Sequence, residues 1–279
     1  MTWEPDLAQS TAPEKPQLEH ISLRARAGSD LRSAARTDNP LWMQAVQLGP
    51  LSAIITPTLP AGEIKKTCVL LHGYGAPGTD LVGLAQAIEA PEGTRFVFLQ
   101  APHTLEGMSG AHAGRAWWHI DMIALQVARM TGQDDALARA TPSGLSEARQ
   151  MVEEALVALE TELGLDWSTL VIGGFSQGAM LSCDWALRSE RSIEGLVQLS
   201  GTVICEAEWL ELLKKHTGLR VFQSHSPDDQ VLPFSLAERH RDSMKRAGLK
   251  NTFVSFRGGH GIAPTVTAAL SRFLAEPPL

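Results

Sequence analysis

The chain has 279 residues, of which 44% are hydrophobic and 20% are charged, so it is long enough to bury one large core. Its formal net charge of -7 argues against nucleic acid as a partner and gives no general attraction to anionic membranes. The sequence holds no run of about 18 apolar residues, so no integral membrane segment is predicted.

The N-terminus and the cysteines favour a cytoplasmic protein. The first residues carry acidic side chains rather than a basic segment followed by an apolar stretch, so no signal or transit peptide is predicted. Cys68, Cys183 and Cys205 are odd in number and lack the spacing of metal ligands. We therefore expect no metal and no organic cofactor.

Residues 1–46 are predicted to form an N-terminal extension, with a single domain over residues 47–279. Four prolines punctuate this polar segment, and residues 23–36 combine alanines with four arginines. This composition favours a poorly ordered or edge-packed arm. Docking of a partner by the arm is the alternative interpretation.

From Leu51 onward, short apolar runs typical of strands alternate with segments typical of helices. The predicted strands are 51–58, 67–72, 95–99, 170–172, 195–200, 219–224 and 252–256. The first is predicted to be an edge strand, because Pro57 stands near its end. The predicted helices are 81–88 (capped by Thr79 or Asp80), 143–163, one directly after Ser176, 206–215, 233–246 and 263–275.

Two further segments are less regular, since residues 101–120 are predicted as a loop and residues 121–141 as partly helical. The alternation of strands and helices predicts right-handed crossovers and a mostly parallel twisted sheet, with helices on both faces. The fold class is therefore α/β.

Residues 170–181 predict a reactive serine at a sharp turn. Gly174-Phe175-Ser176-Gln177-Gly178 fits G-x-S-x-G between a strand and a helix. Glycine two residues before and after the serine removes side chains that would clash with neighbouring backbone. Free N–H groups at the start of the helix favour negative charge there. The alternative is an ordinary turn with a capping serine.

A serine nucleophile needs a base, and a parallel sheet presents it on a loop at the carboxyl end of a strand. His260 stands between glycines after the last predicted strand. Three other histidines follow Ser176 in the sequence. His216 lies at a charged helix end, and His240 lies on a helical face predicted to be solvated. His225 stands just before the loop that carries the candidate acids, which is called the acid loop below. His260 is therefore the predicted base.

Asp228 and Asp229 both lie in the loop after the predicted strand 219–224, so either aspartate can orient the imidazole. Pro227 before Asp228 suits a turn in which Asp228 bonds local backbone, which favours Asp229 as the acid. The oxyanion needs N–H donors, which we expect from the backbone of Gln177 and of Tyr74 in the loop H-G-Y-G. These glycines lack the spacing of phosphate-binding motifs.

Together these motifs resemble the phospholipase/carboxylesterase family, which includes acyl-protein thioesterases. The residues that carry the resemblance are L-L-H-G-Y-G at 70–75, R-A-W-W at 115–118, G-G-F-S-Q-G-A-M at 173–180, Asp229 with V-L-P at 231–233, and G-H at 259–260. The resemblance implies a compact α/β-hydrolase without a large cap, cleaving carboxylic esters or thioesters of acyl chains. It also selects Asp229, because the acid of this family stands just before an apolar pair and a proline.

Two departures from the family pattern concern the substrate. Ala76 stands where the family often has aspartate after H-G-x-G, and the acid loop reads S-P-D-D-Q rather than G-x-x-D-P. Trp117 and Trp118 are candidates to bind substrate by lining an acyl groove, with core packing as the alternative. Residues 122–130 are a further candidate for the groove wall.

A non-catalytic ligand-binding protein on the same fold is the alternative function, because a fold alone does not determine chemistry. Such a protein usually lacks one member of the triad, whereas this sequence has all three. The sequence indicates no oligomeric state.

Overall fold

The computed structural model describes residues 43–105 and 113–276. Nearly all of the predicted N-terminal extension lies outside the described residues, so the extension stays a prediction. No helix in the described ranges is both long enough and apolar enough to span a membrane.

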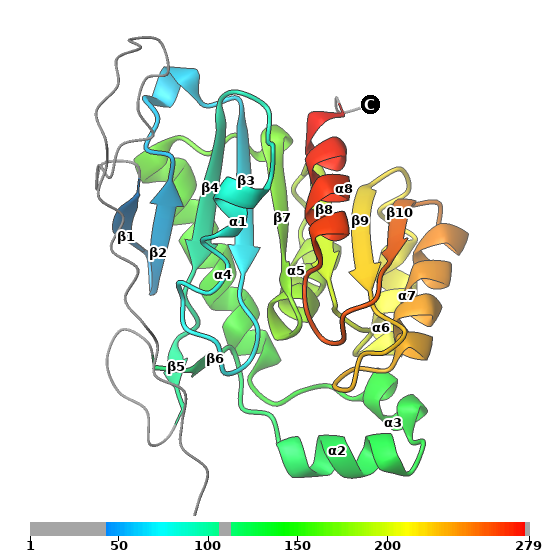
Figure 1. Ribbon diagram of the computed structural model, residues 1–279. Coiled ribbons are helices and arrows are strands. Elements are labelled where there is room, and N and C mark those ends of the chain that lie inside the picture. The colour runs from blue at the N-terminus through cyan, green and yellow to red at the C-terminus, as the bar shows by residue number, and fades with distance from the viewer. Residues whose placement is uncertain (1–42, 106–112, 277–279) are drawn as a thin grey trace, which may run out of the picture. The chain divides into compact units, whose positions relative to one another are not determined.

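One sheet organises the described residues, with strand order β1-β2-β4-β3-β7-β8-β9-β10 (Figure 1). Its strands are β1 (Gln44–Leu48), β2 (Leu51–Thr56), β3 (Lys66–Leu71), β4 (Thr94–Leu99), β7 (Leu170–Phe175), β8 (Gly195–Leu199), β9 (Arg220–His225) and β10 (Lys250–Ser255). From β4 to β10 every neighbouring pair is parallel, whereas β1 pairs antiparallel with β2 and β2 with β4. The predicted mostly parallel sheet is confirmed.

Helices cover both faces of this sheet (Figure 1). On one face a core forms between the sheet and α4 (Leu145–Leu163), α5 (Gln177–Arg188), α6 (Glu206–Leu213) and α7 (Phe234–Arg246). On the other face a second core includes residues around α1 (Leu84–Ala87) and on α8 (Pro264–Ala275). Strands such as β3 and β7 lie between the two cores and are buried along almost their whole length, as expected for parallel strands.

Short elements complete the described chain. They are the 3-10 turns η2 (Ala61–Glu63) and η3 (Trp167–Thr169), the two-stranded ladder of β5 (His103–Thr104) with β6 (Arg115–Ala116), and the helices α2 (Met122–Met130) and α3 (Asp134–Arg139). α2 and α3 lie beyond the carboxyl ends of the parallel strands (Figure 1). They therefore lie at the end of the sheet where an α/β fold places its chemistry.

The prediction of an edge strand at 51–58 is wrong, because β1 pairs outside β2. Pro57 lies beyond the end of β2 and removes no hydrogen bond from the ladder. The sheet also begins at Gln44, three residues before the predicted domain boundary. Gly49 makes the hairpin possible, since its φ of +52° suits a tight turn.

Three other local predictions differ from the structure. The helix predicted over 81–88 is α-helical only at Leu84–Ala87, and its N-cap residue Gly83 makes no side-chain cap, so neither Thr79 nor Asp80 caps it. Within residues 101–120, β5 and β6 form a short ladder instead of a plain loop. His240 is 1% exposed, not solvated, because it lies on the inward face of α7 with Ala237 and Met244.

A buried ion cluster holds α8 at the amino end of the sheet. Glu194 accepts from Lys66 at 2.5 Å and from Arg220 at 3.3 Å. The same two cations donate to the carbonyls of Leu274 and Phe273, each at 2.6 Å, near the C-terminus of α8. Positive charge at a helix C-terminus is favourable, so this cluster fixes the helix that follows the His260 loop.

The tightest backbone approach joins β3, β7 and α5. A Cβ on Gly174 would lie 2.4 Å from the carbonyl oxygen of Leu71, and a Cβ on Gly178 would lie 2.1 Å from the same oxygen. Real side chains do not approach backbone so closely. Glycine at both positions therefore lets the chain turn sharply between β7 and α5, as the sequence predicts.

Gly178→Ala should destabilise the protein by at least about 3 kcal/mol, because the new Cβ overlaps backbone that cannot shift alone. Gly83→Ala is the matched control, because no atom outside its own helix and chain neighbours lies within 4 Å of the place that its new Cβ would take. Denaturant unfolding should show a large fall in the free energy of unfolding for the first variant and little change for the second. Equal effects would contradict this account of the turn.

Candidate active site

Ser176 lies at the turn between β7 and α5 in a strained backbone conformation. Its φ is +54° and its ψ is −115°, a combination that residues with a side chain rarely adopt. The side chain is mostly buried, with 8% of the residue exposed, yet it lines a cavity. The turn thus holds the hydroxyl in one place at the start of a helix.

Asp229 and His260, which lie far from Ser176 in the sequence, form a hydrogen-bonded row with it. His260 Nε2 lies 2.9 Å from Ser176 Oγ, and His260 Nδ1 lies 2.7 Å from Asp229 Oδ2. Asp229 is in the loop after β9, and His260 is in the loop between β10 and α8. Three separate loops at the carboxyl ends of strands bring these side chains together.

The Asp229 side chain is fully buried and remains acidic. Its Oδ1 accepts the backbone N–H groups of Val231 at 2.7 Å and Leu232 at 2.9 Å. Burial raises the pKa of this carboxyl, but the hydrogen bonds from His260 and from the two backbone N–H groups outweigh burial, so its pKa lies below the ordinary value. The carboxylate is therefore ionised beside the imidazole near neutral pH.

Asp228 takes a different place from Asp229. Its Oδ1 accepts the hydroxyl of Ser226 and the backbone N–H of Gly258 at 3.4 Å. Together these contacts tie the loop after β9 to the loop after β10. Asp228 thus bonds within the local turn, whereas Asp229 is the carboxylate that contacts His260.

The backbone N–H groups of Tyr74 and Gln177 have no acceptor among the described residues. In the loop after β3, which carries Tyr74, the next two N–H groups donate to backbone carbonyls. Gly75 N–H donates to the carbonyl of Arg115 at 2.8 Å, and Ala76 N–H donates to that of Gly73 at 3.3 Å. Tyr74 lines the same cavity as Ser176. Both N–H groups are thus available for an incoming oxygen atom.

His72 holds the loop that carries Tyr74. It is 1% exposed, and its Nε2 accepts the backbone N–H of Ala101 at 3.0 Å. Burial lowers its pKa to about 4, so the ring is neutral near pH 7 and can keep this acceptor role. Its carbonyl also accepts the indole N–H of Trp117 at 2.9 Å. The start of the loop that carries Tyr74 is therefore held by two hydrogen bonds, one to Ala101 and one to Trp117.

The side chain of Gln177 has a role that our sequence reasoning missed. It is fully buried, its Oε1 accepts the N–H of Trp117 at 3.0 Å, and its Nε2 donates to the carbonyl of Trp118 at 2.8 Å. These two bonds tie the tryptophan segment to the start of α5. The only signal in the sequence is a long amide at the first position of a buried helix.

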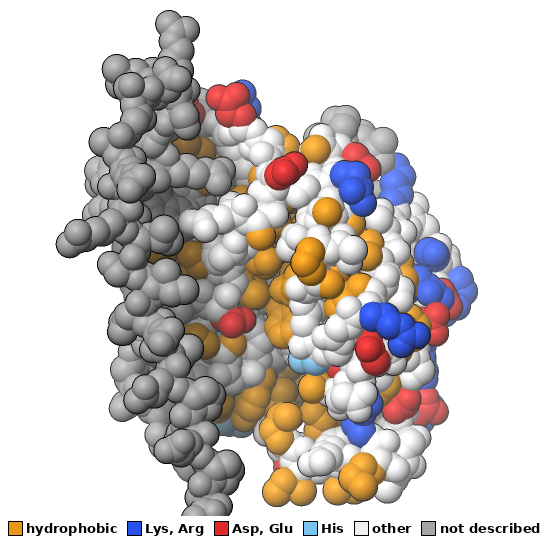
Figure 2. Space-filling model, in the orientation of Figure 1, with side chains coloured by type: hydrophobic (Ala, Val, Ile, Leu, Met, Phe, Trp, Pro, Cys, Tyr) orange, Lys and Arg blue, Asp and Glu red, His pale blue; other side chains and the backbone are white. Residues whose placement is uncertain are grey.

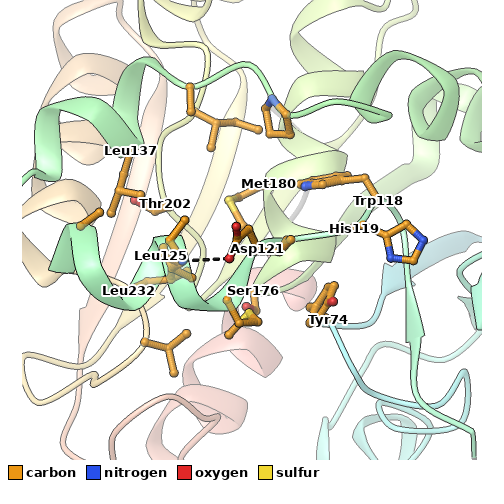
Figure 3. A pocket seen from close by; sticks show the side chains of 18 of the residues that line it. Tyr74, Trp118, His119, Asp121, Leu125, Leu137, Ser176, Met180, Thr202 and Leu232 are labelled. Atoms are coloured by element: carbon orange, nitrogen blue, oxygen red, sulfur yellow. Dashed lines mark hydrogen bonds between the residues drawn. The ribbon is translucent and has the colours of Figure 1, made fainter. Parts of the chain in front are cut away.

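A cavity of about 560 Å³ opens beside Ser176 and His260 (Figure 3). Most of the side chains that line it are apolar. They come from α2, α3, α5 and the loops after β8 and β9, and include Leu125, Ala128, Leu137, Met180, Ile204 and Leu232. Such a lining suits a hydrophobic chain placed next to the serine.

The two tryptophans separate at this cavity. Trp118 lines it, but Trp117 is 0% exposed and its indole N–H is bonded to His72, so Trp117 belongs to the core. This is the core packing that the sequence left open as the alternative for the tryptophans.

α2 is apolar on both of its sides. Leu125 and Ala128 line the cavity, while Ile123, Val127 and Met130 are 77%, 52% and 81% exposed on the outer side. Hydrophobic side chains gather at this lower end of the molecule in Figure 2. Arg129 on the same helix donates to the carbonyl of Asp229 at 3.3 Å, which joins the cavity wall to the acid loop.

Comparison with known proteins places these features in a family. The sequence matches the Phospholipase/Carboxylesterase family over residues 52–276. It is 29% identical over 218 residues to acyl-protein thioesterase 1 of Eremothecium gossypii, covering 73% of this chain and 84% of that protein. It is also 29% identical over 227 residues to acyl-protein thioesterase 1 of Saccharomyces cerevisiae, covering 76% and 92%.

Solved structures agree with this match. The crystal structure of esterase PE8 superposes with a TM-score of 0.64 at 26% identity, covering 81% of this chain and 98% of that one. Arabidopsis thaliana SOBER1 shares the fold, with a TM-score of 0.59 at 20% identity over 75% and 97% of the two chains. Since the family match spans most of the chain, the protein belongs to the phospholipase/carboxylesterase family of α/β-hydrolases.

Proposed function

We propose that this protein is a serine hydrolase that cleaves carboxylic esters or thioesters of acyl groups through an acyl-enzyme. The observation that carries the proposal is the hydrogen-bonded row from Asp229 through His260 to Ser176, at one end of an apolar cavity. The named activities of the similar proteins, acyl-protein thioesterase and esterase, support the same class of reaction.

Acylation begins when Ser176 Oγ attacks the substrate carbonyl. His260 Nε2, 2.9 Å away, accepts the hydroxyl proton as the Oγ–C bond forms. The carbonyl oxygen becomes an oxyanion, and the backbone N–H groups of Tyr74 and Gln177 stabilise it. Asp229 holds the Nδ1–H tautomer of His260 and stabilises the imidazolium.

Collapse of this intermediate breaks the bond to the alcohol or thiol. His260 returns its proton to that leaving group, and the acyl group stays on Ser176. A water molecule then attacks the acyl carbonyl while His260 takes its proton. The second collapse releases the carboxylic acid and restores the serine hydroxyl.

The acyl chain enters the cavity between α2, α3 and α5. Each methylene transferred from water to such a lining contributes about 0.8 kcal/mol, so chain length governs affinity until the cavity is full. Trp118 and Met180 lie next to each other in the cavity wall, and Leu137 lies on α3 (Figure 3). This apolar lining favours hydrophobic acyl groups over polar ones.

Ser176→Ala should lower kcat for p-nitrophenyl ester hydrolysis by at least roughly 10³-fold and abolish labelling by a fluorophosphonate, because the nucleophilic oxygen is gone. Ser182→Ala is the matched control, since Ser182 is buried on the same helix and its hydroxyl bonds to Ala179 and Gln198, away from the cavity. Full ester turnover by the Ser176 variant would overturn the proposal. Ligand binding by wild-type protein without acylation would favour the binding-protein alternative.

Asp229→Asn should lower kcat by roughly 10³- to 10⁴-fold, because an amide cannot hold the correct histidine tautomer or stabilise the imidazolium. Asp228→Asn should stay within about tenfold of wild type, because the Asp228 side chain bonds to Ser226 and the loop backbone rather than to His260. Steady-state kinetics of the two variants side by side tests the assignment. A reversed order of effects would identify Asp228 as the acid.

Leu125→Trp should raise KM for long-chain p-nitrophenyl esters at least about tenfold while sparing acetate esters, because the larger ring fills part of the acyl cavity. Ile123→Trp is the matched control on the outer side of the same helix, where the side chain is 77% exposed. The measurement is a chain-length series for both variants. A uniform loss over all esters would show that Leu125 does not line the acyl path.

A further inference from the structure

A second histidine contacts the acid of the row. His225, the last residue of β9, is 0% exposed, and its Nε2 lies 3.3 Å from Asp229 Oδ2. The same nitrogen lies 3.2 Å from the carbonyl oxygen of Leu232. His225 does not line the cavity, so it does not touch the substrate.

These contacts determine which ring nitrogen carries hydrogen. Asp229 Oδ2 and the Leu232 carbonyl oxygen, the two groups near Nε2, are both hydrogen-bond acceptors. An unprotonated Nε2 would place its lone pair against theirs, which is repulsive. Burial lowers the pKa of His225 more than the Asp229 charge raises it, so the ring is neutral near pH 7. Nδ1 makes no hydrogen bond within the described residues, so a neutral ring carries its hydrogen on Nε2 and donates it to the carbonyl of Leu232.

The Asp229 carboxylate therefore has hydrogen-bond donors at both of its oxygens. Oδ1 accepts from the N–H groups of Val231 and Leu232, and Oδ2 accepts from His260 at 2.7 Å and lies 3.3 Å from His225. The hydrogen bond of His225 Nε2 goes to the carbonyl of Leu232, and the same nitrogen lies 3.3 Å from the oxygen that holds His260. The positive end of an N–H dipole at this distance draws electron density away from Oδ2. The bond to Leu232 also holds the segment whose N–H groups donate to Oδ1.

We propose that His225 is a positioning residue: its uncharged ring holds the Leu232 segment that fixes Asp229, and its Nε2–H, close to Oδ2, moderates the basicity of that oxygen toward His260. The inference rests on the proposed function of the row. The other charged or titratable groups near this loop are Arg129 from α2, which donates to the carbonyl of Asp229, and Asp228, which bonds to Ser226 and Gly258.

His240 provides an internal comparison. It is also buried, at 1% exposure, and burial lowers its pKa to about 4. Its ring packs on Trp209 at 5.2 Å, and its Nε2 lies 3.6 Å from the sulfur of Cys183. Replacing either histidine costs core packing, but of these two only His225 contacts the acid.

The test compares His225→Phe, which removes the donor, with His225→Gln, whose amide can restore an N–H near the Nε2 position. The control is His240→Phe. For His225→Phe, kcat should fall about tenfold, as expected when a buried hydrogen bond and an N–H contact with a charged carboxylate are lost together. KM should stay within about twofold of wild type, because His225 lies outside the cavity lining.

The pH profile provides a readout that a purely structural role would not change. Without the Nε2–H of His225 beside Oδ2, the carboxylate holds the imidazolium more strongly, so the acidic midpoint of kcat/KM should rise by about half a pH unit. His225→Gln should recover most of kcat and the wild-type midpoint. His240→Phe should lower Tm without moving either quantity.

Two results would overturn the inference. One is a wild-type kcat and midpoint in His225→Phe; the other is an equal shift in His240→Phe. If His225→Phe does not fold, the ring ¹⁵N resonances of wild-type protein decide, since the inference requires Nε2–H on His225 and is refuted by Nδ1–H. Failure of the proposed function is recognised separately, by ester turnover in Ser176→Ala.

Discussion

The close backbone contact between β3 and the start of α5 is the constraint on which the rest of the site depends. The carbonyl of Leu71 lies where side chains on residues 174 and 178 would have to go. Only glycine at both positions permits the turn that holds Ser176 at a positive φ. The same packing brings the N–H of Gln177 to the end of the sheet that carries the loop of Tyr74.

Around this turn, the buried polar side chains of Asp229 and Gln177 make hydrogen bonds that fix their orientation. A carboxylate as deeply buried as Asp229 is costly unless hydrogen bonds compensate it, and its neighbours on both oxygens provide them. The side chain of Gln177 does the same for the backbone of the tryptophan segment. The site is thus rigid on its polar side.

The apolar side of the site is built differently. α2 and α3 lie past the carboxyl ends of the strands and close the cavity with side chains such as Leu125 and Leu137. α2 contributes no residue that is fully buried, and Arg129 joins it to the acid loop. This wall, rather than the central sheet, sets the size of the group that the cavity can accept.

The sequence by itself determined the α/β fold class, the order of strands and helices, and the turn at Ser176. These depend on periodicity and local backbone sterics, which nearby residues carry. It also supplied the candidates His260 and Asp229, because loops after parallel strands converge at one edge of the sheet.

Only the tertiary structure decided which side chains meet. It added β1 outside the predicted edge strand, buried His240, turned Trp117 into the core while Trp118 lines the cavity, and brought His225 against Asp229. Contacts between residues far apart depend on how loops and helices pack. Local sequence patterns do not encode that packing, because the same short segment suits either a buried or an exposed position.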